Sequence, residues 1–289
     1  MQVGIYVPDG DIPDVRGFSP AIVAWNHALR LSRFAPTIFC ADENGRPTAE
    51  TCHGIPLYRI RIGRVYRRLF CKWSRLDPLP LHRRLLRRLQ QAEPALWHVH
   101  QLEFPVADFR RRLRRATPIL VHAHVTTHRF SRERGLADRY LAVSDFVRRA
   151  LAEEKGYPPE RIVVLPNGVD TTLFRPGTPE ERSRTRQTLG VGPNAPMVLF
   201  AGRKQEVKGF DTFREVGRRL LKEGGDVVFV AVGPEPADAR RDASYARCQA
   251  LRLQLARTGC YLELEALPQA RLATLFRAAD VLFAPSRIE

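Results

Sequence analysis

Short apolar runs alternate with amphipathic helical stretches along this chain, and that order limits the fold more than any other feature. The apolar runs have the length of buried strands, and turn-forming residues separate them from segments with helical spacing. They include QVGIYVP, TIFCA, PILVHAH, RYLAVS, MVLFA and DVVFVAV. Strands that alternate with helices predict βαβ units, and therefore an α/β fold with parallel, doubly wound sheets.

The chain is long enough for two domains of this kind. It has 289 residues, of which 44% are hydrophobic, whereas one domain usually has about 100 to 150 residues. Between Phe174 and Pro196 the sequence is polar and rich in Gly and Pro, and the strand-then-helix order restarts after it. We therefore expect one domain at residues 1–174 and a second at residues 175–289, with a cleft between them. Ligands of such sheets bind beyond the carboxyl ends of the strands, where Gly17, His124, Gly202 and Pro285 are expected.

The charge of the chain is strongly positive. A formal net charge of +16 predicts a surface that attracts polyanions. The densest basic runs are Tyr58–Gln90 and Phe109–Arg115. Apolar side chains between the arginines of the first run suit contact with an anionic membrane, but LHRRLLRRLQ also fits an ordinary amphipathic helix with a solvated basic face. The absence of an aromatic RNA-binding motif or a DNA-binding helix pair argues against a nucleic-acid partner.

The sequence favours a cytoplasmic protein, with peripheral contact at the inner face of the membrane as the alternative. The first residues lack the basic and long apolar regions of a signal peptide, and no stretch approaches the roughly 20 apolar residues of a membrane span. We expect free thiols and no metal site, because the cysteines are scattered and form neither a CxxC motif nor a Cys/His cluster of metal spacing. They are Cys40, Cys52, Cys71, Cys248 and Cys260.

The segment FAGRKQEVKGF, Phe200–Phe210, places two cations beside a predicted helix start. Gly202 permits a tight turn after the strand, and the free N–H groups of a helix N-terminus favour an anion. Arg203 supplies a planar fork for phosphate oxygens and Lys208 a mobile point charge, so the pair suits a diphosphate. The other interpretation is that both are solvated loop cations.

Two consecutive blocks of the sequence resemble one enzyme family. VSDFVRRALAEEKGYPPERIVVLPNGVDTTLFRP, Val143–Pro176, closely resembles the signature region of the retaining GT-B glycosyltransferases, family 4 (glycosyl transferases group 1), and FAGRKQEVKGF is similar to the next block of that family. The resemblance extends to VFVAVGPEP, LPQARLATLFRAADVLFAPSRIE, WHVHQ and TPILVHAHVTTH, and so covers nearly the whole chain. It implies the GT-B fold, in which two Rossmann-like domains face a cleft.

The resemblance also implies an activity. Such an enzyme is a hexosyl- or other glycosyltransferase that moves a sugar from a nucleotide-diphosphate sugar to an acceptor hydroxyl with retention. The setting implied is the synthesis of cell-envelope polysaccharide, glycolipid or natural-product glycosides. The first domain would bind the acceptor, lipid-linked or polysaccharide, and the second the nucleotide-sugar donor. No cofactor is implied besides that donor.

Site residues carry over from the family position by position. Arg203 and Lys208 would bind the donor diphosphate in the turn at Gly202, and family members need no divalent metal because these cations do its work. In VGPEP, Gly233 and Pro234 would contact the donor.

His124 aligns with the family histidine that faces the sugar at the reaction centre. A neutral imidazole there accepts a hydrogen bond from a sugar hydroxyl, whereas a charged one steadies phosphate. His122 points to the same face of the strand and is a rival, and His98 and His100 are expected near the strand end.

The sequence departs from the family pattern in its first loop and at its last residue. The first loop has Gly10 and Gly17 instead of two adjacent glycines, so Gly17 is the residue expected near the donor phosphate. Asp9-Gly10-Asp11 matches the DxD metal motif of another glycosyltransferase fold, but turn chemistry explains it better.

Glu289 aligns with the first member of a glutamate pair that holds the donor sugar and ribose, and the chain ends there. We therefore interpret the chain as a C-terminally truncated enzyme with an incomplete second domain. Two alternatives remain: an inactive fragment that binds membranes or nucleic acid through its basic surface, or a GT-B-fold nucleotide-sugar epimerase.

Overall fold

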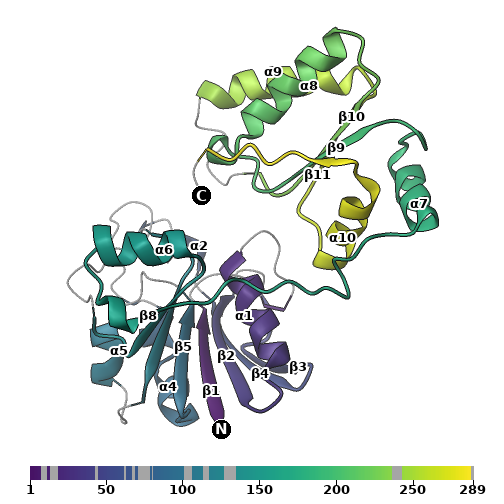
Figure 1. Cartoon of the computed structure of the whole chain (residues 1–289). Coiled ribbons are helices and arrows are strands. Elements are labelled where there is room, and N and C mark those ends of the chain that lie inside the picture. Colours follow the sequence, from purple (N-terminus) through teal and green to yellow (C-terminus); the bar gives the residue numbers. More distant parts are fainter. Residues whose placement is uncertain are drawn as a thin grey trace. The chain divides into compact units, whose positions relative to one another are not determined.

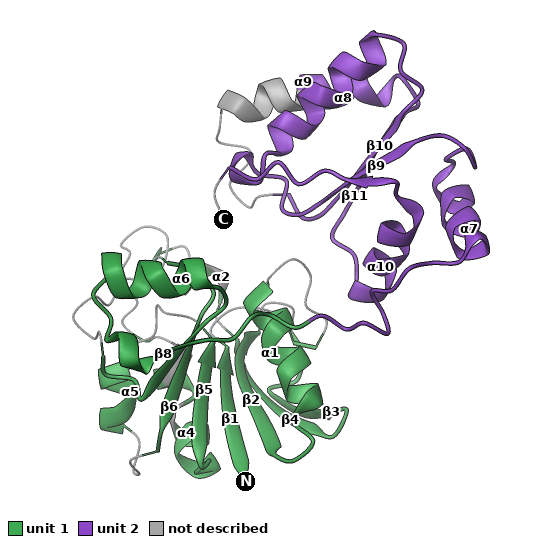
Figure 2. Ribbon diagram, in the orientation of Figure 1, with its two compact units in different colours: residues 1–168 green, residues 169–289 purple. Residues whose placement is uncertain are grey.

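The structure is a computed structural model of the 289-residue chain. It describes all residues except 8–11, 14–18, 43–44, 62, 67–68, 71–78, 80, 101–105, 113–116, 127–134, 236–242 and 288–289. The chain forms two compact units, unit 1 at Met1–Gly168 and unit 2 at Val169–Glu289 (Figure 2).

Unit 1 is built on an eight-stranded sheet of order β3-β4-β2-β1-β5-β6-β7-β8 (Figure 1). Its strands are β1 (Gln2–Val7), β2 (Ala35–Asp42), β3 (Ala49–Cys52), β4 (Ile55–Arg61), β5 (Leu96–His100), β6 (Ile119–Ala123), β7 (Arg139–Ala142) and β8 (Ile162–Val164). All neighbouring strands pair in parallel except β3, which is antiparallel to β4. The strand order reverses beside β1, as in a doubly wound sheet.

Helices cover both faces of this sheet. They are α1 (Ser19–Arg30), α2 (Arg64–Tyr66), α3 (Leu81–Arg84), α4 (Leu86–Ala92), α5 (Val106–Arg112) and α6 (Asp145–Arg149), with a π-helical turn at Ala150–Glu154 and a 3-10 turn at Pro159–Arg161. Successive strand residues point to opposite faces. Ile38 and Cys40 of β2 therefore pack with α1, whereas Phe39 joins Trp97 and Phe109 in the core under α4 and α5.

Unit 2 has a four-stranded parallel sheet of order β11-β10-β9-β12. Its elements are α7 (Pro179–Leu189), β9 (Met197–Ala201), a 3-10 turn η5 (Glu206–Lys208), α8 (Phe210–Lys222), β10 (Val228–Val232), α9 (Ala243–Ala256), β11 (Tyr261–Leu264), α10 (Gln269–Ala278) and β12 (Val281–Leu282). Leu199 and Val230 pack towards α7 and α10, while Phe200 and Phe229 pack towards α8. The predicted α/β fold with parallel sheets is confirmed.

The two units divide between Gly168 and Val169, whereas composition placed the boundary after Phe174. The intervening residues pack on α10 of unit 2. Arg277 donates to the carbonyl of Leu173 at 3.0 Å, and the rings of Phe174 and Phe276 lie 5.9 Å apart. The Gly- and Pro-rich stretch itself contains α7, which begins with a capping box between Thr178 and Glu181.

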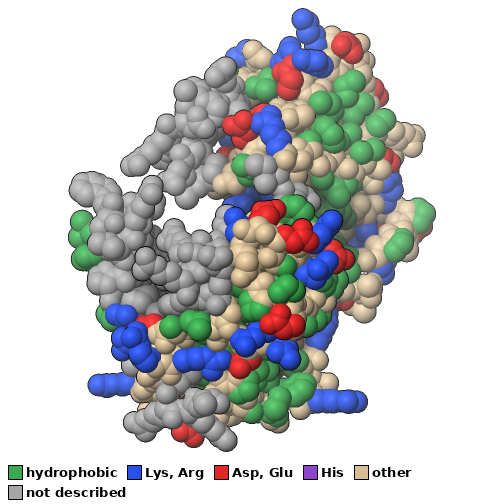
Figure 3. Space-filling model, turned by 60° about the vertical axis from the view of Figure 1, so that its left-hand side comes forward, with side chains coloured by type: hydrophobic (Ala, Val, Ile, Leu, Met, Phe, Trp, Pro, Cys, Tyr) green, Lys and Arg blue, Asp and Glu red, His purple; other side chains and the backbone are tan. Residues whose placement is uncertain are grey.

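The basic stretch before β5 is amphipathic. Leu85 and Leu89 are buried in unit 1, while Arg87 and Arg88 are exposed, as expected for a helix with a solvated basic face. Leu69 and Phe70 are partly exposed; Trp73 and Leu76 lie outside the described residues. On the face drawn in Figure 3, basic side chains are interspersed with acidic ones over the described part of the chain. No helix among the described residues has the length and apolar character of a membrane span.

The core of unit 1 leaves no space for a side chain at Gly4 of β1. A β-carbon at this position would lie 2.4 Å from the ring of Trp97, which is 1% exposed. We expect Gly4→Ala to lower the free energy of unfolding of unit 1 by about 1 to 3 kcal/mol, the usual cost of overpacking. Urea unfolding followed by tryptophan fluorescence measures this, because Trp25, Trp73 and Trp97 all belong to unit 1.

The matched control is Gly63→Ala, since a β-carbon at Gly63 would have no atom within 4 Å among the described residues. Equal unfolding midpoints for the two variants would contradict the close contact between Gly4 and Trp97.

Candidate functional site

The carboxyl ends of β9 and β10 bring three of the predicted donor residues together. The N–H of Gly202 donates to the carbonyl of Val232 at 3.0 Å, and that of Lys204 donates to Pro234 at 3.1 Å. A β-carbon on Gly233 would lie 1.9 Å from the Gly202 oxygen, and Gly233 has a φ of +146°. Only glycine fits this approach, so Gly202, Gly233 and Pro234 form one closely packed edge.

Lys204 anchors the loop that follows β9. Its side chain is buried, and its ammonium lies 3.5 Å from carboxylate oxygens of Glu235 and Glu263. Arg214 of α8 adds a hydrogen bond of 2.6 Å to Glu263, and the Tyr261 hydroxyl also donates to that carboxylate. A buried charge needs such partners. Lys204 therefore ties the loop that carries Arg203 to the segment after β10 and to β11.

The pKa values of this buried group reflect its partners. Burial alone would raise the pKa of Glu263, but the hydrogen bond from Tyr261 and the charge and hydrogen bonds of Arg214 lower it. Burial and the adjacent Glu263 carboxylate raise the pKa of the Tyr261 hydroxyl. At neutral pH Glu263 is thus ionised and Tyr261 protonated, which is the state that pairs with Lys204 and Arg214.

Arg203 and Lys208, in contrast, are cations without a counter-ion in the described part of the chain. Arg203 is exposed and Lys208 half-buried, and neither makes an ion pair with a described residue. Lys208 ends η5, and Gly209, in the left-handed conformation, begins α8 without a side-chain cap. Two available cations therefore lie on the loop that leads into a helix N-terminus, whose first N–H groups lack helical partners.

The chain segment after β12 lies against the same loop. A β-carbon on Gly209 would meet the Pro285 oxygen at 2.0 Å, and the N–H of Arg287 donates to Val207 at 3.0 Å. The Arg287 side chain pairs with Glu206 and Asp211. Two predicted site residues, Glu289 and Gly17, lie outside the described residues.

In unit 1, the predicted catalytic histidine is part of a cluster of imidazoles. His124 directly follows β6 and is half-buried. The parallel register pairs His100 with His122, and hydrogen bonds join His100 Nδ1 to His124 Nε2 at 3.1 Å and His98 Nε2 to His122 Nδ1 at 3.2 Å. His27, from the last turn of α1, stacks on His122 with ring centroids 5.7 Å apart.

These histidines are uncharged at neutral pH. Burial, together with the neighbouring imidazoles, lowers the pKa of His98 to about 3, that of His122 to about 2 and that of His124 to about 4. Burial also lowers the pKa of His100 well below its ordinary value. Of the two roles open to His124, the hydrogen-bond acceptor of a neutral ring fits this environment and the cation does not.

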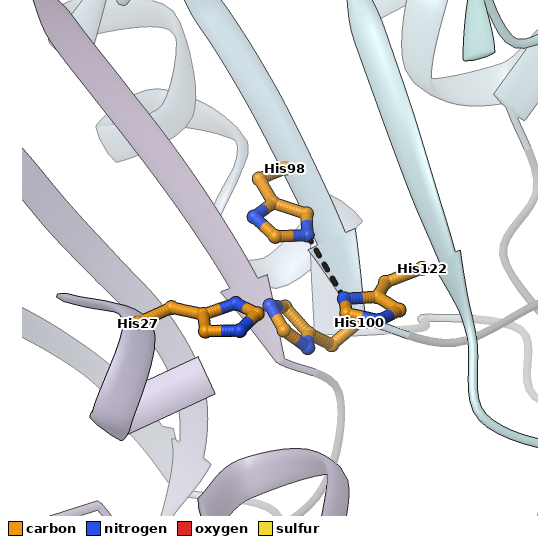
Figure 4. Close-up of side chains that lie close together, drawn as sticks. All are labelled: His27, His98, His100 and His122. Atoms are coloured by element: carbon orange, nitrogen blue, oxygen red, sulfur yellow. Dashed lines mark hydrogen bonds between the residues drawn. The ribbon is translucent and has the colours of Figure 1, made fainter. Parts of the chain in front are cut away.

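The cluster includes a set of side chains capable of holding a metal ion. His27, His98, His100 and His122 each offer one ring nitrogen, and these atoms lie within 4.8 Å of one another (Figure 4). Sequence spacing did not reveal this set because its members come from α1, β5 and β6. The HxH patterns at His98 and His122 were the available signal, but His27 had none. Lys204 was missed as well, since burial distinguishes it from its neighbours and sequence spacing does not.

Acid should destabilise unit 1 through these imidazoles. A histidine with a lowered pKa in the folded state stays neutral while its unfolded counterpart, with a pKa near 6.5, gains a proton. The resulting stability is complete above about pH 6.5 and is lost progressively as the pH falls towards the folded pKa values. Urea midpoints from tryptophan fluorescence, measured with a chelator present, should therefore drop between about pH 7 and about pH 5.

Replacing one buried ring tests the source of this effect. His98→Gln should flatten the pH dependence of the urea midpoint, whereas His53→Asn should leave it unchanged because His53 is exposed. A midpoint independent of pH in this range would rule out buried neutral imidazoles.

Comparisons with known proteins agree with this architecture. Residues 21–173 match the family described as Glycosyltransferase Family 4. The chain is 26% identical over 278 residues to the lipopolysaccharide 1,2-N-acetylglucosaminetransferase of Salmonella typhimurium, covering 93% of this chain and 70% of that protein. It is 33% identical over 156 residues to the D-inositol 3-phosphate glycosyltransferase of Nocardia farcinica, covering 53% of this chain and 33% of that protein.

Solved structures show the same fold at low sequence identity. Anabaena HepE in complex with UDP-glucose has a TM-score of 0.70 and 18% identity, and covers 99% of this chain and 74% of its own. The catalytic domain of starch synthase IV from Arabidopsis thaliana, bound to ADP and acarbose, has a TM-score of 0.72 and 14% identity. That alignment covers 100% of this chain and 78% of the starch synthase chain. The family match spans more than half of the chain, and the fold is the GT-B fold. The chain therefore belongs to Glycosyltransferase Family 4 and is a glycosyltransferase.

Proposed function

We propose that this chain transfers a sugar from a nucleotide-diphosphate sugar to an acceptor hydroxyl, with retention of configuration, and that Arg203 and Lys208 bind the donor diphosphate. The observation that carries the proposal is a pair of cations on the loop between β9 and α8 that have no counter-ion among the described residues. Nearby Lys204, Arg214 and Arg287 are all paired with carboxylates. A dianionic ligand would supply the negative charge that pairs with Arg203 and Lys208.

The chemistry of glycosyl transfer explains why such cations are useful. As the bond to the sugar breaks, positive charge develops on the sugar ring and negative charge on the departing diphosphate. The guanidinium of Arg203 offers paired N–H donors and Lys208 offers a point charge, and both stabilise the leaving group more than the intact donor. The N-terminus of α8 adds a favourable dipole for the same anion.

The buried network beneath the loop supports this role. Cations stabilise a transition state best when they need little rearrangement, because the cost of orienting them is met during folding. Lys204 ties the loop to Glu263 of β11, and Gly233 packs directly against Gly202. We infer that Gly202, Gly233 and Pro234 shape the floor of the donor site and leave room for the nucleotide.

His124 is proposed as the residue of unit 1 that contacts the donor sugar. Its neutral ring accepts a hydrogen bond from a sugar hydroxyl, and its Nε2 is oriented by His100. Glu289 is proposed to contact the sugar hydroxyls and Gly17 the donor phosphate. The departing phosphate itself would deprotonate the acceptor hydroxyl, so the transfer needs no separate basic side chain.

The names of similar proteins support the class of substrate. HepE is described with UDP and with UDP-glucose, and the starch synthase with ADP. The Salmonella relative is a lipopolysaccharide 1,2-N-acetylglucosaminetransferase. We therefore propose a nucleotide-diphosphate hexose or N-acetylhexosamine as donor, and a cell-envelope glycan or glycolipid as acceptor. The setting would be the cytoplasm, with the basic surface of unit 1 in contact with an anionic membrane.

Replacing the two cations tests the donor site. Arg203→Ala and Lys208→Ala should each lower kcat/KM by about 100- to 1000-fold, as the loss of one preorganised contact to a developing anion does in other enzymes. A thermal-shift screen with UDP-, GDP- and ADP-sugars first identifies the donor, because a ligand that binds only the folded state stabilises it. Release of the nucleoside diphosphate then measures the rate.

Matched controls are available within unit 2. Arg184→Ala on α7 and Lys222→Ala at the end of α8 remove exposed cations of the same types from other elements, and should leave the rate within about twofold of the original chain. Unchanged rates in Arg203→Ala and Lys208→Ala would refute the diphosphate site. No stabilisation or turnover with any nucleotide-sugar would refute the donor class.

A further inference from the structure

We propose that His27, His98, His100 and His122, here called the four-histidine group, bind one divalent transition-metal ion of the zinc type inside unit 1. The proposal concerns a separate property of the chain and does not depend on glycosyl transfer. It rests on the convergence of the rings, on unpartnered ring nitrogens and on the chemistry of the donor set.

The fold gathers the four rings from separate parts of the chain. β5 contributes His98 and His100, two residues apart and therefore on the same face of the sheet. β6 contributes His122, paired in register with His100, and α1 crosses that face with His27 in its last turn. In Figure 4 the rings of His27, His98 and His122 lie around that of His100. One nitrogen of each lies within 4.8 Å of those of the others.

Two of these rings have a buried nitrogen that lacks a hydrogen-bond partner among the described residues. They are Nε2 of His100 and Nε2 of His122, and both side chains are fully buried. A buried polar atom without a partner destabilises the folded state, and Nδ1 of His124 is a third such nitrogen in the described part of the same cluster. A metal ion that accepts the lone pairs of His100 and His122 would remove this cost at both rings.

The other nitrogen of each of these rings is already engaged. Nδ1 of His100 is bonded to His124, and Nδ1 of His122 is bonded to His98. Histidines that bind metals usually have this arrangement, in which one nitrogen faces the ion and the second is held by a neighbouring group that fixes the ring. His124 would then be the outer partner of a metal ligand. With the ion bound, His100 Nδ1 donates to His124 Nε2, so the proton of His124 lies on Nδ1 and this ring changes from an acceptor to a donor towards a sugar hydroxyl.

The ligand type indicates which ions would bind. Neutral imidazole is the form that coordinates metals, and it suits Zn²⁺, Cu²⁺, Ni²⁺ and Co²⁺, whereas Mg²⁺ and Ca²⁺ prefer oxygen. A tetrahedral zinc ion with bonds of about 2.1 Å needs nitrogens about 3.4 Å apart. The candidate nitrogens lie within 4.8 Å of one another, and the ion would replace the His98–His122 hydrogen bond, because a neutral ring that accepts this bond has no second lone pair for a metal. His27 is half-buried in the last turn of α1, and its ring would supply the fourth ligand of the ion.

Metal titration of the whole chain tests the proposal. The protein is prepared without a polyhistidine tag and treated with a chelator, and is then titrated with Co²⁺, whose visible absorption reports its coordination. We expect one Co²⁺ per chain with the intense absorption of a four-coordinate site, and its displacement by one equivalent of Zn²⁺. Excess Mg²⁺ or Ca²⁺ should leave the absorption unchanged. Absence of a stoichiometric, zinc-displaceable Co²⁺ signal would overturn the proposal.

Variants locate the ion. His27→Ala and His100→Gln should each weaken Zn²⁺ binding by on the order of 100-fold, at least as much as the loss of an outer partner does in known sites. His53→Asn removes an exposed histidine of the same unit and should bind like the original chain.

Circular dichroism checks that each variant is folded, and if His100→Gln is not, His27→Ala decides, because His27 is only half-buried. Equal zinc affinity in His27→Ala and the original chain would overturn the proposal. Arg203→Ala and Lys208→Ala should bind zinc normally, so failure of the donor site and failure of the metal site give different results.

Discussion

Parallel pairing of the strands is the constraint on which the rest of this structure depends. In a parallel sheet all carboxyl ends lie at one edge, so residues that follow different strands become neighbours. The pairing of β9 with β10 sets Ala201 beside Val232 and so brings Gly202 against Gly233. In unit 1, the pairing of β5 with β6 sets His100 beside His122. Both candidate sites follow from strand register.

The two units stabilise buried polar side chains in different ways. In unit 2, the buried side chains of Lys204 and Arg214 are paired with the carboxylate of Glu263. In unit 1, the imidazoles pack against one another and their pKa values are lowered. They are therefore neutral, which avoids the cost of burying a charge. The first arrangement holds a loop in place and leaves Arg203 and Lys208 available for an anion. The second provides lone pairs and is suited to hydrogen bonding or to a metal ion.

Family membership and site chemistry answer different questions. The family match identifies a glycosyltransferase, whereas the GT-B fold carries many reactions and names neither the donor nor the acceptor. The residues that support a diphosphate donor are few, namely the cations Arg203 and Lys208 and the glycines packed beside them. The metal-binding chemistry of the four-histidine group is deduced from the rings themselves and not from the family comparison.

The amino-acid sequence alone predicts the fold class, the motif at Phe200–Phe210 and the family. Each depends on local order: alternating apolar runs, a glycine after a strand, and cations at a fixed spacing. The close approach of Gly202 and Gly233 and the burial of Lys204 required the folded chain, because these contacts join residues distant in sequence. Residues 169–174 were assigned to the other unit for the same reason, since the partners of Leu173 and Phe174 are Arg277 and Phe276. His27 illustrates this limit best: nothing near it in the sequence marks it, and only the packing of α1 against the sheet brings it to three other histidines.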